Sequence, residues 1–442
     1  MLIQKRNGLY QDYDAYKIKS AIQKAFQSLQ VQIDERQLNE LVYDVEKQVY
    51  EKMPVEKIQD VVEETLMKYG YHQVAKAYIL YRQKHSENRA VIWDLIEILN
   101  DKELIELFEN IQKDYPQDEY SLKFLLIKLK TFYKDNMNQK EAFQMLIKAS
   151  VELISKDAPK WEMISARFLN YQIHKTIKEK MQQLKISSFY EKIKYLTNEG
   201  YYGCYILENY TKADIDELSS YIKEERNELF TYSGLELVMK RYLIQNHERE
   251  ILEKPQEMFM GIAMHLAIPE QERVKWAKEI YDILSTLKVT MATPTMSNAR
   301  KPFHQMSSCF IDTVDDSLAG IYKSIDNFAK VSKHGGGMGL YFGKVRANGS
   351  SIRGFKGAAG GVIRWIKLVN DTATAVDQLG VRQGAAAVYL DAWHKDLPEF
   401  LNLRTNNGDD RMKAHDVFPA ICYPDLFWKM AKEDLNATWY LM

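Results

Sequence analysis

Hydrophobic residues recur at helical spacing through most of the first 285 positions, and the pattern changes after that point. At the start of the chain, two short stretches, 2–6 and 9–13, flank Asn7-Gly8. This pair favours a two-residue hairpin turn, because both turn positions need a positive φ. Asp14 can then cap a first helix, and Gly70 can end a third. The expected apolar faces of the first three helices are Ile18, Ile22, Phe26 and Leu29; Leu38, Leu41, Val42, Val45 and Val49; and Ile58, Val61, Val62, Thr65 and Leu66.

A fourth helix is expected over about 74–82, so residues 1–90 form a unit of one hairpin and four helices. Residues 91–285 are expected to be almost wholly helical, because apolar residues keep helical spacing and Gly and Pro are scarce. From 286 to 442, Gly-rich turns separate short apolar runs, such as 340–342 and 386–390, from helical segments at 317–333 and 361–376. This alternation predicts an α/β architecture with ligands bound at the turns.

Composition narrows the class of protein. The 442 residues are 46% hydrophobic and 27% charged with a net charge of -1, which argues against a nucleic-acid partner. Neither a membrane-spanning apolar stretch nor a signal peptide is recognisable, so a cytoplasmic protein is expected. Three widely spaced cysteines, Cys204, Cys309 and Cys422, argue against a disulfide framework and against a cysteine-based zinc site, and no metal is expected in this chain.

Three local patterns after residue 290 allow more than one interpretation. The glycine run 335–339 is neither a Walker A loop nor a dinucleotide fingerprint, so close backbone packing competes with anion binding. Cys309 follows two serines, but on its own a buried small hydrophobic role is the stronger interpretation. Arg346 and Arg353 flank Gly349 and could hold a polyphosphate or form surface salt bridges.

Several segments, taken together, resemble a known family. The N-terminal stretches Lys5-Arg6-Asn7-Gly8, Tyr13-Asp14, Lys17-Ile18 and 74–82 resemble an ATP-cone, a module that binds ATP or dATP. Further segments resemble the large subunit of class I ribonucleotide reductase: 153–159, 230–234, 292–297, 307–309, 316–318, 346–347, 352–354, 381–382 and 393–394. The resemblance implies an ATP-cone, a helical N-terminal domain and the first half of a ten-stranded α/β barrel, with expected ranges 1–90, 91–285 and 286–442.

The resemblance also implies roles for individual residues. Cys309 matches the first of two cysteines that form a disulfide as the ribose is reduced. The implied substrate-binding residues are Thr293, Ser308, Gly336, Gly337 and Arg382. The implied specificity site for a deoxynucleotide effector comprises Asp316, Ser317, Leu318, Arg346, Arg353 and Gln378, and the segment 377–385 matches a loop that couples effector to substrate. The implied cone site comprises Lys5, Arg6, Gln11, Asp12, Tyr13, Asp14, Ala15, Tyr16 and Lys17, although Val55 and Gln59 depart from the family's Thr and His.

The implied function is reduction of ribonucleotides under control by ATP, dATP and dNTP effectors. The implied partners are a ribonucleotide substrate, a thioredoxin- or glutaredoxin-like reductant, and a small metal-containing subunit, rather than adenosylcobalamin, as the radical source. A homo-oligomer is also expected. No radical-cysteine motif matches within these 442 residues, so we expect a second polypeptide to supply the C-terminal half of the subunit. The rival interpretation is a non-catalytic ATP/dATP sensor. Repressors that resemble the cone module carry a zinc ribbon beside it, and this sequence contains no Cys-x-x-Cys pair for such a ribbon.

Overall fold

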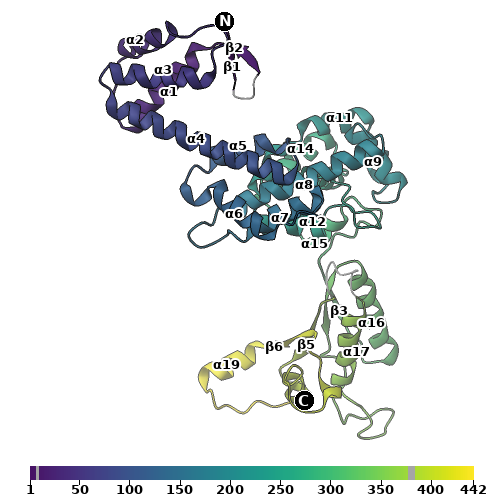
Figure 1. Ribbon diagram of the computed structural model, residues 1–442. Coiled ribbons are helices and arrows are strands. Elements are labelled where there is room, and N and C mark those ends of the chain that lie inside the picture. The colour runs from purple at the N-terminus through teal and green to yellow at the C-terminus, as the bar shows by residue number, and fades with distance from the viewer. Residues whose placement is uncertain (6–8, 377–383) are drawn as a thin grey trace. The chain divides into compact units, whose positions relative to one another are not determined.

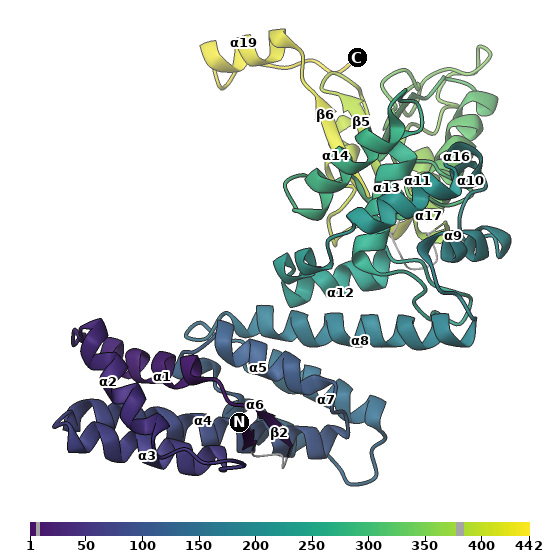
Figure 2. The same cartoon turned by 90° about the horizontal axis from the view of Figure 1, so that it is seen from above.

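The computed structural model describes residues 1–5, 9–376 and 384–442. The chain forms two compact units, Met1–Ile164 and Ser165–Met442, which are described separately. Figures 1 and 2 show the elements of both units. No helix within the described ranges combines the length and the apolar character needed to cross a membrane.

The first unit begins with a small antiparallel hairpin, as the sequence predicts. Strand β1 (Leu2–Gln4) pairs with β2 (Tyr10–Asp12), and Ile3 lies opposite Gln11. The Lys5 amide donates a hydrogen bond to the Leu9 carbonyl at 2.7 Å. The strands are therefore offset by one residue from the register that a two-residue turn at Asn7-Gly8 would give. Residues 6–8 themselves lie outside the described residues.

Four helices follow the hairpin: α1 (Ala15–Ser28), α2 (Glu35–Glu46), α3 (Val55–Lys68) and α4 (His72–Leu99). The predicted cap is confirmed, because the Asp14 side chain accepts a hydrogen bond from the Tyr16 amide. Gly70 follows α3 with a φ of 79°, as a helix-ending glycine should. The apolar faces of α1, α2 and α3 pack into one core around Ile22, Leu41 and Leu66. Unlike the expected short fourth helix, α4 continues through residue 90 to Leu99.

Residues 91–285 are mainly helical, as predicted, and a further short helix follows them before the sheet. The first unit adds α5 (Leu104–Asp114), α6 (Leu122–Phe132) and α7 (Gln139–Val151). Helix α8 (Trp161–Gln183) spans the boundary between the units. The second unit continues with α9 (Phe189–Asn198), α10 (Tyr205–Asn209), α11 (Lys212–Tyr221), α12 (Tyr232–Arg241), α13 (Pro255–Ala267), α14 (Arg273–Ser285) and α15 (Thr293–Asn298). Short 3-10 helices occupy Asp118–Tyr120 and Glu224–Leu229.

A parallel sheet follows, which confirms the predicted α/β architecture. Its strands are β3 (Cys309–Thr313), β4 (Gly337–Tyr341), β5 (Ala386–Asp391) and β6 (Val417–Cys422), hydrogen-bonded in that order. Helices α16 (Leu318–Lys333) and α17 (Ile363–Ala375) connect successive strands and match the helical segments expected there. The remaining elements are α18 (Leu397–Leu401), a 3-10 turn at Asp410–Met412 and α19 (Asp425–Glu433).

The two faces of this sheet differ in what covers them. Met338, Leu340 and Val388 point to one face and join a core with α16 and α17, which lie along the same side of the strands in Figure 1. Alternate residues point the other way. On that second face Ile311 is 88% exposed and Phe418 is 55% exposed. We call this second surface the open face.

Candidate active and effector sites

Cys309 and Gly337 lie side by side at the amino end of the sheet. They are the first residues of β3 and β4 and are direct partners in the parallel register. The Gly337 amide donates a hydrogen bond to the carbonyl of Ser308 at 2.8 Å. The Cys309 side chain is exposed, because it points to the open face. The interpretation of Cys309 as a buried small hydrophobic residue is therefore wrong.

The two glycines expected near the substrate face different surroundings. A Cβ at Gly336 would lie 2.6 Å from Val331 Cγ1 and 2.8 Å from Phe310 Cε2, so packing explains this glycine. A Cβ at Gly337 would meet only the carbonyl oxygens of Ala385 and Ser308, at 3.5 and 3.7 Å. Gly337 therefore leaves open space beside Cys309, whereas Gly336 allows close packing on the covered face of the sheet.

Helix α15 brings Thr293 to the segment that leads into β3. Thr293 is the first residue of α15, and the following Pro294 suits a first helical turn. Thr295 Oγ1 donates to the Met306 carbonyl at 3.2 Å. Asn298 Nδ2 donates to the Gln305 carbonyl at 2.9 Å. The expected substrate residues Thr293 and Ser308 thus belong to two segments that the structure joins.

A buried ion pair that sequence reasoning missed anchors α15. Arg300 is fully buried and contacts Glu253 through two hydrogen bonds of 2.7 and 2.6 Å. Its Nη1 also donates to the Met296 carbonyl at 2.9 Å. The Tyr202 hydroxyl donates to the same carboxylate at 2.6 Å, and burial raises the pKa of Tyr202 well above its usual value. No local pattern could reveal this pair, because its partners lie 47 residues apart.

The opposite, carboxyl end of the sheet carries the charged residues of the expected effector site. Asp316 follows β3, and Arg346 follows β4. Arg346 Nε donates to Asp316 Oδ2 at 2.7 Å, and the Arg346 amide donates to Oδ1 at 3.3 Å. Arg346 Nη1 also donates to the Ser351 carbonyl at 3.0 Å. The structure therefore brings Asp316 and Arg346 together but pairs them with each other.

Ser317, Leu318 and Arg353, which are also expected at the effector site, lie at the start of α16 and in the loop that follows Arg346. Ser317 caps α16 by accepting a hydrogen bond from the Gly320 amide at 3.0 Å. Leu318 is 66% exposed. Arg353 is also exposed and has a φ of 51°. Within the described residues it has neither an ion pair nor a hydrogen bond from its side chain, so its guanidinium is available to an anion.

The loop that carries both arginines is fixed at its base by residues that follow β5. His394 Nε2 lies 2.8 Å from the Val345 carbonyl. The Asp396 carboxylate accepts hydrogen bonds from the amides of Asn348 and Val362, at 2.9 and 2.8 Å. Asp396 is only 4% exposed. Sequence reasoning singled out neither role, although His394 belonged to one of the resembling segments.

Among the described residues, those expected at the substrate site next to Cys309 and those expected at the effector site lie at opposite ends of the sheet. Along β3, Thr313 follows Cys309 by four residues, roughly 13 Å at about 3.3 Å per residue. The coupling segment, with Gln378 and Arg382, falls largely on residues 377–383, outside the described residues. Its flanks lie against Ser332, beside the amino end of β4. Ser332 Oγ donates to the Val376 carbonyl at 2.8 Å, and a Cβ at Gly384 would lie 2.7 Å from Ser332 Oγ.

The expected cone residues form one continuous strand-to-helix turn. Gln11 and Asp12 end β2, Asp14 caps α1, and Ala15 and Tyr16 begin that helix. The Tyr13 hydroxyl lies 3.5 Å from Glu46 Oε1, and burial, with a smaller contribution from Glu46, raises the pKa of Tyr13 to about 12. Lys5 and Lys17 are both exposed, whereas Arg6 lies outside the described residues. Val55 begins α3.

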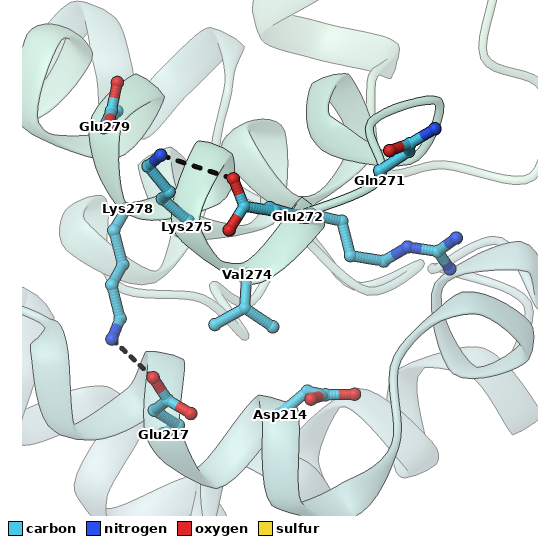
Figure 3. A pocket seen from close by; sticks show the side chains of 9 residues that line it. Asp214, Glu217, Gln271, Glu272, Val274, Lys275, Lys278 and Glu279 are labelled. Atoms are coloured by element: carbon cyan, nitrogen blue, oxygen red, sulfur yellow. Dashed lines mark hydrogen bonds and ion pairs between the residues drawn. The ribbon is translucent and has the colours of Figure 1, made fainter.

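A surface pocket elsewhere in the second unit contains none of the expected site residues. It lies between α11 and the start of α14, and Figure 3 shows its mixed charges. Lys278 pairs with Glu217 at 2.6 Å, and Lys275 pairs with Glu272 at 3.3 Å. Because four acidic and three basic side chains line it together, this pocket offers no strong preference for an anion or a cation. Across the described ranges, no cluster of three or more His, Cys, Asp or Glu residues is arranged to hold a metal ion.

Comparison with family models divides the chain into successive matches. Residues 1–87 match the ATP cone domain, 228–304 match the all-alpha domain of ribonucleotide reductase, and 307–442 match its barrel domain. Together the three matches cover more than half of the chain, and they occur in chain order.

Individual relatives agree with the family models. The chain is 54% identical to the ribonucleoside-diphosphate reductase subunit alpha of Treponema pallidum, over all of this chain and 54% of that protein. It is 43% identical to the Helicobacter pylori (strain J99) subunit alpha over 70% of this chain and 38% of that protein, and 32% identical to the Chlamydia trachomatis subunit alpha over 99% and 45%. The chain thus spans about half the length of the curated relatives it matches. On this evidence the chain belongs to the family of ribonucleotide reductase large (alpha) subunits that carry an ATP-cone.

Proposed function

We propose that this chain is the effector-controlled part of a ribonucleoside-diphosphate reductase large subunit and that Cys309 supplies one of its two reducing thiols. The observation that carries the proposal is the exposed Cys309 thiol at the open amino end of β3, beside the uncrowded Gly337. Reduction at the ribose 2′-carbon releases the hydroxyl as water and needs two electrons. Two thiols supply those electrons by forming a disulfide, which a thioredoxin- or glutaredoxin-like dithiol then reduces.

The second thiol of that disulfide has to come from outside the described sheet. Cys422 lies at the carboxyl end of β6, and two strands separate β6 from β3, so these edge strands are roughly 14 Å apart. A disulfide requires Cα atoms within about 7 Å. Cys204 precedes α10, and a hydrogen bond with Glu208 raises the pKa of its thiol, which disfavours the reactive thiolate.

The C-terminal part of a large subunit, called the complementing polypeptide in the experiments below, would supply the second redox cysteine and the radical cysteine. Among the described strands, β6 pairs only with β5, so its other edge offers hydrogen-bonding groups to a further strand. The exposed Ile311 and Phe418 of the open face offer apolar surface for the same chain to cover. A small metal-containing subunit would generate the radical.

Two nucleotide sites would control the reaction. The cone would bind ATP or dATP through Lys5, Arg6 and Lys17. At the carboxyl end of the sheet, Asp316 would accept hydrogen bonds from the sugar of a dNTP effector, and Arg346 and Arg353 would hold its phosphates. The flanks of the coupling segment lie at the amino end, so an effector bound at the carboxyl end of the same copy is at the far end of the sheet from them. We therefore propose a homo-oligomer in which the effector site of one copy acts on the coupling segment of another.

Reconstitution tests the proposed activity. The chain is combined with the C-terminal part of a related alpha subunit, a radical-generating subunit, a dithiol reductant, a ribonucleoside diphosphate and a dNTP. Deoxynucleotide is expected only when both halves of the large subunit are present. Robust reduction by residues 1–442 without the other half would contradict the need for a complementing polypeptide.

Calorimetry tests the cone separately. The full chain should bind ATP or dATP, and Lys5→Ala combined with Arg6→Ala should weaken that binding by roughly 2–6 kcal/mol, because each charge-assisted contact contributes about 1–3 kcal/mol. Lys57→Ala, at a solvated position of α3, is the matched charge control. Equal nucleotide affinity in the double variant and the wild type would show that Lys5 and Arg6 do not contribute to the site.

A further inference from the structure

We infer that the ion pair between Asp316 and Arg346 closes the proposed effector site in the absence of ligand, and that a polyphosphate has to displace Asp316 from Arg346 in order to bind. This inference rests on the proposed function of the site and specifies how its occupancy is regulated. It assigns Asp316 a second role, as an internal competitor of the ligand's phosphates.

The geometry shows why Arg346 is not ready to receive a phosphate. A guanidinium binds a phosphate best through two parallel N–H groups on one edge. Asp316 Oδ2 occupies Nε on one edge, at 2.7 Å. The Ser351 carbonyl occupies Nη1 on the other edge, at 3.0 Å. Each edge of Arg346 that could bind a phosphate with two hydrogen bonds is therefore partly occupied.

The pair is weak enough for a ligand to open. The Arg346 and Asp316 side chains remain 38% and 32% exposed, so water screens their attraction. A triphosphate carries several negative charges and can contact the available Arg353 at the same time. The ligand thus offers Arg346 a stronger anionic partner than Asp316, and it needs no rearrangement of the fold to do so.

The base of the loop stays fixed while this exchange takes place. Asp396 holds the amides of Asn348 and Val362, and His394 contacts the carbonyl of Val345. Val345 and Val362 flank the segment that carries Arg346 and Arg353, and Asn348 lies within it. We therefore expect ligand binding to reorient the Arg346 side chain rather than to order the whole loop.

Binding of inorganic tripolyphosphate to the full chain, in magnesium-free buffer, isolates the phosphate contacts from recognition of the sugar and base. Asp316→Asn keeps the shape of the side chain but removes its charge, so it should raise the affinity for tripolyphosphate by about three- to fivefold, the size expected for release of an exposed ion pair. The affinity for dTTP should rise less, because Asp316 would also accept a hydrogen bond from the sugar. Thermal unfolding of each variant verifies that it is folded.

Two comparisons make the result specific. Asp315→Asn removes the same charge one residue away, where no ion pair with Arg346 exists, and should leave the affinity unchanged. In an Arg346→Ala background, Asp316→Asn should produce no gain. No gain in the single variant, an equal gain with Asp315→Asn, or a gain that persists without Arg346 would each overturn the inference. If instead the Arg346→Ala and Arg353→Ala variants both bind dTTP and tripolyphosphate with the affinity of the wild type, the proposed effector site itself is wrong.

Discussion

The amino and carboxyl ends of the parallel sheet carry different kinds of side chain. At the amino end, Cys309 and Gly337 leave a thiol beside open space. At the carboxyl end, Asp316 and Arg346 form an ion pair, and Asp396 fixes the loop that holds the arginine. The first end suits a reaction in which electrons pass through sulfur, and the second suits recognition of a charged ligand.

This difference shows how one sheet can separate chemistry from control. A charge beside a thiol changes its reactivity, because a positive charge favours the reactive thiolate and a negative charge disfavours it. A phosphate-binding site, by contrast, depends on charged groups. Since β3 and β4 run from one end to the other, the same two strands position both sites without bringing their charges together.

The largest expected effect follows from changing the thiol at the amino end. In the reconstituted reductase, Cys309→Ser should abolish multiple turnover, because a hydroxyl cannot form the disulfide that supplies two electrons. Association with the complementing polypeptide, measured by sedimentation, should be unaffected. Cys204→Ser is the control and should retain full turnover. Continued turnover by the Cys309 variant would show that the amino end does not take part in the reaction, and it would contradict the proposed difference between the two ends.

The next effect concerns the carboxyl end. Arg346→Ala or Arg353→Ala should weaken dTTP binding about tenfold or more, since the loss of one charge-assisted contact costs roughly 1.4 kcal/mol or more. Deletion of residues 1–90 tests independence from the cone, although it interrupts α4, so the remaining chain has to be verified as folded. Equilibrium dialysis in the presence of the complementing polypeptide measures the dTTP affinity of the arginine variants and of the shortened chain. Unchanged affinity in the two arginine variants would contradict the assignment of this end to the effector.

The sequence predicted those features that repeat locally. The face formed by Leu38, Leu41 and Val45 was recognisable because a helix repeats every 3.6 residues. The length of α4 was not, because the polar stretch after Arg82 breaks the apolar pattern while containing neither Gly nor Pro to end the helix. The hairpin was predicted with the wrong register, since its pairing depends on contacts beyond the turn.

The sites were predicted only in part, for a related reason. The resemblance named Asp316 and Arg346, but not that they bond to each other across 30 residues. The buried pair of Arg300 and Glu253 had no sequence signal at all. The exposure of Cys309 depends on which face of the sheet is left uncovered, and tertiary structure alone decides that.

A third prediction separates folding from function at the amino end. Gly336→Ala should destabilise the fold by about 1–3 kcal/mol, because its Cβ would overlap Val331 and Phe310. Gly337→Ala meets only ordinary contacts and should fold normally, yet its methyl group would enter the space beside Cys309. Turnover of the reconstituted enzyme should therefore fall several-fold, mainly through a higher KM. Equal unfolding free energies for the two variants would show that these glycines do not differ as described.

The smallest expected effect is a pH dependence of the unfolding free energy, caused by a histidine that contacts the segment leading into β3. His265, in α13, is buried, and its ring lies 5.0 Å from Tyr205 and 5.2 Å from His304, which belongs to the segment before β3. Burial, with a smaller contribution from His304, lowers the pKa of His265 to about 4. Its Nδ1 is buried without a hydrogen bond from any described residue, so a proton there would lack an acceptor. The unfolded chain, with the ordinary histidine pKa of about 6.5, therefore takes up this proton first as the pH falls.

Stability from the neutral ring should thus be complete above about pH 6.5 and should be lost progressively between pH 6.5 and 4. His265→Phe keeps an aromatic ring but cannot titrate, so the loss of unfolding free energy over this range should be smaller than in the wild type by about 1–2 kcal/mol. Urea unfolding at each pH measures this difference, and His247→Phe, at an exposed position, should follow the wild type. If the two variants follow the same pH profile, burial of the neutral His265 ring does not cause the loss of stability between pH 6.5 and 4.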